Sequence, residues 1–93
     1  MNIIYRTQAS ASEILKGVNV SLSAEYEKDV KPSQVTFYCE GTLQEDENPY
    51  VNISGTYDCV NRVFSSINGA SLPSGFLPQV ETKIMEFYNQ LGN

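Results

Sequence analysis

Histidine is absent from this chain of 93 residues, and only two cysteines are present. Histidine is the commonest general base and the commonest metal ligand in proteins. A Cys/His zinc site needs about four ligands, and a disulfide framework needs more than one pair of cysteines. No glycine-rich phosphate loop follows an expected strand. We therefore expect no catalytic residues, no metal site and no cofactor, and we expect that the protein is not an enzyme.

Basic residues are also scarce, with 6 lysines and arginines against 11 aspartates and glutamates and a net charge of −5. Binding to a nucleic-acid backbone needs a basic surface, so we expect no direct nucleic-acid partner. No apolar run reaches the roughly 18 residues that span a membrane, and residues 1–6 do not resemble a signal peptide. The expected location is the cytoplasm, or the host cytoplasm if the source is a virus.

Three segments alternate apolar and polar residues, namely 18–26, 35–43 and 50–59. A period of two is typical of a strand with one face on a core and the other in water. Short polar loops join the three segments, which predicts an antiparallel meander. The alternation also sorts the side chains. It places Cys39 in the core opposite Ile53, so a disulfide to Cys59 is not expected.

The remaining segments are less regular. Residues 2–8 suit an edge strand, and residues 10–17 suit either one or two helical turns or an irregular crossing loop. Residues 60–67 have helical spacing, with Asp58 as the N-cap, although 62–67 also fits a fourth meander strand; we favour the helix. The glycine- and proline-rich residues 68–75 are expected to form a loop.

An amphipathic helix is expected after this loop, with Pro78 at its first position and Gly92 as its stop. Its apolar residues recur at steps of three and four and should pack on the inward face of the meander. The expected fold is thus a single small α+β domain over residues 1–93, with an antiparallel sheet of three to four strands and a C-terminal helix on one face. The apolar residues of this helix are Leu77, Val80, Ile84, Phe87, Tyr88 and Leu91.

In outline, residues 17–59 and the proline-containing residues 72–78 with the following helix resemble the SecB-type export chaperones. The shared features are three antiparallel strands, a Gly-Thr-Tyr strand end, a proline-rich stretch and a C-terminal amphipathic helix. The resemblance implies an oligomer that holds unfolded chains on apolar grooves. The chain is short for the long central helix of that family.

The outward face of the expected sheet carries two tyrosines among serine, threonine and asparagine, a composition found in adaptable binding surfaces. The alternative interpretation is a solvated face made of good strand formers. We expect a non-enzymatic protein-binding module, in character a phage or mobile-element accessory protein that inhibits or modulates a host factor. The alternatives are a SecB-like oligomeric chaperone and a small structural or assembly protein, and a second copy of the chain in a homo-oligomer is the other candidate partner. The candidate binding residues are Thr36, Tyr38, Tyr50 and Asn52 on the sheet, with Glu45, Asp46 and Glu47 at an acidic loop tip.

Overall fold

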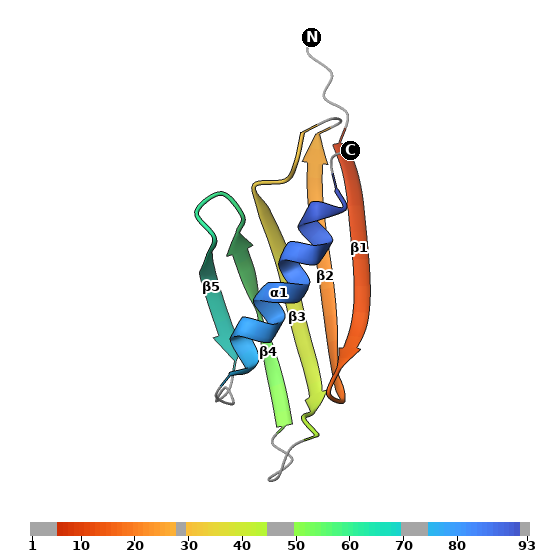
Figure 1. Cartoon of the computed structure of the whole chain (residues 1–93), viewed down its shortest axis with the longest axis vertical. Helices are drawn as coiled ribbons and strands as arrows, with labels where there is room; N and C mark the ends of the chain where they lie inside the picture. Colours follow the sequence, from red (N-terminus) through yellow and green to blue (C-terminus); the bar gives the residue numbers. More distant parts are fainter. Residues whose placement is uncertain (1–5, 28–29, 45–49, 70–74, 92–93) are drawn as a thin grey trace.

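The computed structural model describes residues 6–27, 30–44, 50–69 and 75–91. An antiparallel sheet carries one helix on one of its faces (Figure 1). Each strand pairs with its neighbours in sequence, so the order across the sheet is β1-β2-β3-β4-β5. The elements are β1 (Arg6–Leu15), β2 (Val18–Glu27), β3 (Gln34–Thr42), β4 (Tyr50–Asp58), β5 (Val63–Gly69) and α1 (Phe76–Asn89). The predicted α+β meander is confirmed, but the described residues form five strands of the sheet rather than three to four.

The predicted division of the strands into two faces is confirmed. The inward residues of β2, β3 and β4 are buried, and the residues between them face solvent. On the helix, Phe76, Val80, Ile84 and Phe87 join the same core cluster. Cys39 lies opposite Ile53 as expected, and both cysteines are free and buried.

The prediction of helical turns or a crossing loop at residues 10–17 was wrong, because residues 10–15 belong to β1. Strand β1 pairs with β2 from Arg6 to Leu15 without a register shift. Lys16 and Gly17 form the connecting turn, and both have positive φ (51° and 89°). A two-residue hairpin turn with positive φ at both positions matches the twist of the flanking strands, which explains the glycine.

The helix favoured at residues 60–67 was also wrong, and the alternative strand is observed as β5. Asp58 still acts as a cap, but of the turn that precedes the strand. Its Oδ1 accepts hydrogen bonds from the backbone N–H of Val60 (2.9 Å) and Asn61 (3.1 Å). Of the loop expected at 68–75, Asn68 and Gly69 belong to β5, and residues 70–74 lie outside the described residues.

The C-terminal helix begins two residues earlier than expected, at Phe76, and its expected stop at Gly92 lies outside the described residues. Hydrogen bonds from the sheet side help to hold it. The Tyr57 hydroxyl donates to Glu81 Oε2 at 2.7 Å. The Lys31 Nζ donates to the carbonyl oxygens of Tyr88 (3.1 Å) and Leu91 (2.8 Å), where the helix dipole is negative.

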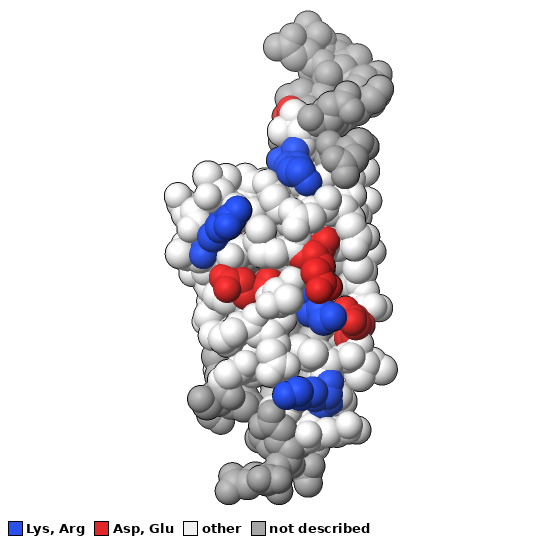
Figure 2. Space-filling view, viewed as in Figure 1, with Lys and Arg blue, Asp and Glu red and all other residues white. Residues whose placement is uncertain are grey.

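Lysine and arginine are interspersed with acidic residues on the helix-bearing face rather than gathered into one basic patch (Figure 2). No helix among the described residues is long and apolar enough to cross a membrane.

Candidate functional site

The sheet face that does not carry α1 holds the four candidate residues of the strands. Tyr38 and Tyr50 are exposed by 43% and 55%, and Thr36 and Asn52 are exposed as well. The register places Thr36 opposite Thr56 and Asn52 opposite Glu40. The acidic tip, Glu45, Asp46 and Glu47, lies outside the described residues.

One carboxylate joins the two tyrosines. The Tyr38 hydroxyl donates to Glu40 Oε2, and the Tyr50 hydroxyl donates to Glu40 Oε1 at 2.9 Å. We call these three residues the tyrosine cluster. The geometry follows from the strands, since Tyr38 and Glu40 are two residues apart on one face of β3 and Tyr50 comes from the start of β4. The cluster therefore holds both rings in place on the exposed face.

These hydrogen bonds shift the acidity of all three groups. The bonds from Tyr38 and then from Tyr50 lower the pKa of the Glu40 carboxyl below its ordinary value. The same bonds are the largest cause of the raised pKa of each phenol. At neutral pH the cluster is one carboxylate between two neutral phenols. A carboxylate with a lowered pKa and both oxygens occupied is a poor general base, so the cluster suits binding better than proton transfer.

A row of five hydroxyl side chains crosses the same face, with one residue from each strand. The register pairs Ser10 with Ser23, Ser23 with Thr36, Thr36 with Thr56 and Thr56 with Ser66. We call it the hydroxyl row. These side chains are short, so the surface is hollowed beside Tyr38. Two adjoining hollows of about 400 Å³ and 530 Å³ share Ser10, Ser23 and Thr36 in their linings.

Glu40 was not among the binding residues predicted from the sequence, although the alternation along this strand places it on the same face as Tyr38. Its role depends on Tyr50, ten residues away and brought near by the pairing of β3 with β4. The spacing of Tyr38 and Glu40 on one strand face was the only available signal.

The described residues contain no group of three or more cysteine and acidic side chains placed to hold a metal ion. Burial raises the pKa of the Cys39 thiol to about 11, and the pKa of Cys59 is raised by burial and then by the nearby charge of Asp58. Thiolates are the reactive and metal-binding form, so both cysteines behave as small apolar core residues. Comparison of the chain with family models, with curated proteins and with solved structures found no match.

Proposed function

We propose that this protein is a non-enzymatic module that binds another protein through the outward face of its sheet. The observation that carries the proposal is the tyrosine cluster. Among the described residues, Tyr38 and Tyr50 are the exposed aromatic rings of this face, and hydrogen bonds to Glu40 fix both of them. Tyrosine is enriched in the energetically dominant part of protein interfaces. A side chain that is already fixed loses less entropy when it binds.

The surroundings of the cluster support a protein partner. The hydroxyl row can donate and accept hydrogen bonds, and it carries no charge that would have to be desolvated. The hollow lined by Tyr38, Ser10, Ser23 and Thr36 gives a partner side chain room to enter beside the tyrosine ring. Rigid tyrosines next to small adaptable polar residues form the usual composition of antibody binding surfaces.

The test uses affinity capture from the native host with the wild-type protein and with the double variant Tyr38→Ala/Tyr50→Ala. We expect the double variant to bind the captured partner at least about thirtyfold more weakly, the effect of losing one strong interface residue. Val60→Ala is the matched control, because it removes a side chain that is 72% exposed at the turn before β5. If every partner is retained at unchanged affinity by the double variant, the proposed surface is wrong.

Two further variants resolve the contribution of each part of the surface. Tyr38→Phe/Tyr50→Phe keeps both rings but removes the hydrogen bonds to Glu40, so we expect a smaller loss than with alanine. Charge reversal of Glu45, Asp46 and Glu47 tests the acidic tip, which should steer a basic partner in a salt-dependent way. Suppression of the aggregation of unfolded proteins by a large oligomer, measured with light scattering, would instead support the chaperone alternative.

A further inference from the structure

Strand β1 forms an open edge of the sheet. Among the strands that the structure describes, β1 has a neighbour on one side only (Figure 1). It pairs with β2 over ten residues without a bulge, whereas the pairing of β5 at the other edge is shifted between Thr56 and Tyr57. Bulges, charges and prolines are the usual devices that protect an edge from further pairing. Residues 7–12 of β1 contain neither a charge nor a proline, so this edge offers a regular row of backbone donors and acceptors.

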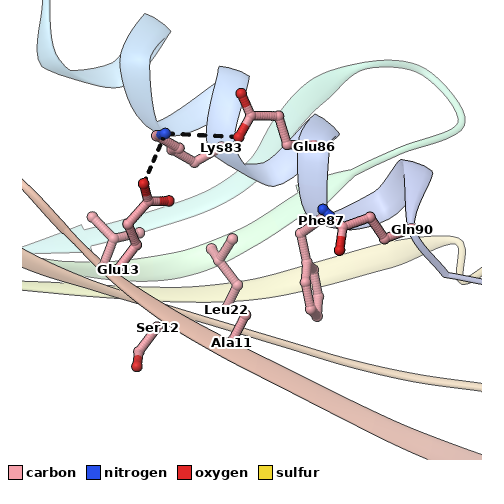
Figure 3. A pocket seen from close by; sticks show the side chains of 9 residues that line it. Ala11, Ser12, Glu13, Leu22, Lys83, Glu86, Phe87 and Gln90 are labelled. Atoms are coloured by element: carbon pink, nitrogen blue, oxygen red, sulfur yellow. Dashed lines mark hydrogen bonds and ion pairs between the residues drawn. The ribbon is translucent and has the colours of Figure 1, made fainter.

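A groove runs beside this edge on the helix-bearing face. Its volume is about 100 Å³, and its lining includes Ala11, Glu13, Leu22, Lys83, Glu86 and Phe87. We call it the β1 groove. Figure 3 shows the Phe87 ring extending from α1 toward Leu22 and Ala11 on the sheet. The groove exists because Ala11, opposite Leu22 in the register, is too short to fill the space below α1. A larger apolar side chain on an added strand would lie about 5 Å from its opposite residue on β1 and could fill the groove.

The mouth of the β1 groove is acidic. The Lys83 Nζ lies 2.9 Å from Glu13 Oε1 and 3.7 Å from Glu86 Oε2 (Figure 3). One ammonium group between two carboxylates leaves one negative charge, and the whole chain has a net charge of −5. A segment with a basic residue is therefore the complementary occupant. A second copy of this chain fits less well, because it is equally acidic and its β1 offers mainly alanine and serine to a groove that they cannot fill.

We propose that the open side of β1 accepts an extended segment of another protein as an added strand. Backbone hydrogen bonds to β1 supply the affinity, as in other cases of strand addition to a sheet edge. A bulky apolar residue of the segment enters the β1 groove, and a basic residue of the segment lies near Glu13 and Glu86. This surface is distinct from the tyrosine cluster, so either surface can fail its test without deciding the other.

The probe is a fluorescent synthetic peptide that alternates valine with threonine and has lysine at both ends. Its binding is followed by fluorescence anisotropy, and its position by hydrogen exchange of the backbone amides. We expect saturable binding and slower exchange in β1. A peptide with N-methylated backbone amides should not bind, because it cannot complete the strand pairing. A peptide with glutamate in place of lysine should bind more weakly, and this difference should shrink as salt rises.

On the protein side, Ala11→Leu fills the β1 groove while keeping an apolar residue on the strand. We expect this variant to bind the lysine peptide at least about tenfold more weakly than the wild type does. We expect Asn68→Leu on β5 to bind the peptide with the affinity of the wild type. Circular dichroism checks that both variants are folded. The proposal fails if the lysine peptide does not bind, if N-methylation or Ala11→Leu leaves binding unchanged, or if the free protein is a dimer whose β1 amides are already protected.

Discussion

Replacement of Gly55 by alanine should detach or displace β5. Gly55 lies on β4 opposite Ile67, and a Cβ atom built on it would lie 2.0 Å from the carbonyl oxygen of Ser66 and 2.8 Å from its carbonyl carbon. Ordinary contact begins near 3.4 Å, so the Ser66 carbonyl oxygen would have to move by about 1.4 Å. Backbone within a paired strand cannot make that movement without shifting its neighbours.

The loss in free energy of unfolding can be estimated from the overpacking at Gly55 and from the contacts that β5 makes with the core. Overpacking a well-filled site costs about 1–3 kcal/mol. The Phe64 ring also makes edge-to-face contacts with Phe37 (centroids 5.4 Å apart) and Tyr57 (5.0 Å), each worth about 0.5–1.5 kcal/mol. If the shift weakens these contacts, the free energy of unfolding falls by about 2–4 kcal/mol. For a domain of this size that lowers Tm by at least about 8 °C.

The assay is thermal unfolding followed by circular dichroism, with urea unfolding to obtain the free energy. Ser54→Ala is the matched control, since it changes the preceding, outward-facing residue and should alter stability by less than about 0.5 kcal/mol. A Gly55→Ala variant with a Tm within about 3 °C of the wild type would refute the argument that this glycine is required by the close approach of β5.

Two other predictions concern the contacts that hold α1. Lys31→Met keeps most of the side-chain stem but removes the hydrogen bonds to the helix C-terminus and the cation 4.8 Å above the Tyr88 ring, so urea unfolding should show a loss of about 1 kcal/mol. Burial, followed by the hydrogen bond to Glu81, raises the pKa of Tyr57 to about 12. Because the folded state keeps this phenol neutral, its contribution to stability is complete below pH 10 and is lost as the pH rises toward 12. Urea unfolding across this pH range should show a steeper decline for the wild type than for Tyr57→Phe, and equal slopes would contradict the assignment.

The three central strands were predictable because large apolar residues alternate with polar ones along them. Strand β1 was predicted only in part. The edge strand expected at residues 2–8 covers its start, but residues 9–15 were missed, since its inward residues include Ala9 and Ala11, which are small and only weakly apolar. The spacing of Ser10 and Glu13 also imitates a helix capping box. Pairing with β2 over the full length of β1 outweighed that local signal, as tertiary contacts commonly do.

The helix predicted at residues 60–67, where β5 is observed, was wrong for a different reason. The register shift beside Thr56 and Tyr57 inserts an extra residue, so Phe64 pairs with Tyr57 and Ile67 pairs with Gly55. Both β5 residues thus lie on the same face although they are three positions apart, a spacing that normally indicates a helix. A bulge cannot be read from hydrophobic periodicity alone.

The same limit applies to the tyrosine cluster, because alternation placed Tyr38 on the outward face but only the register of β3 and β4 brings Tyr50 to Glu40.

The position of α1 after all five strands has a consequence for synthesis. Each strand pairs with the one before it, so the meander can grow one hairpin at a time as the chain leaves the ribosome. The helix residues that cover the sheet, Val80, Ile84 and Phe87, are synthesised last. Until they emerge, the apolar face of β2 and β3 is exposed to solvent. At typical elongation rates this interval lasts on the order of seconds, long enough for the bare sheet to meet other nascent chains.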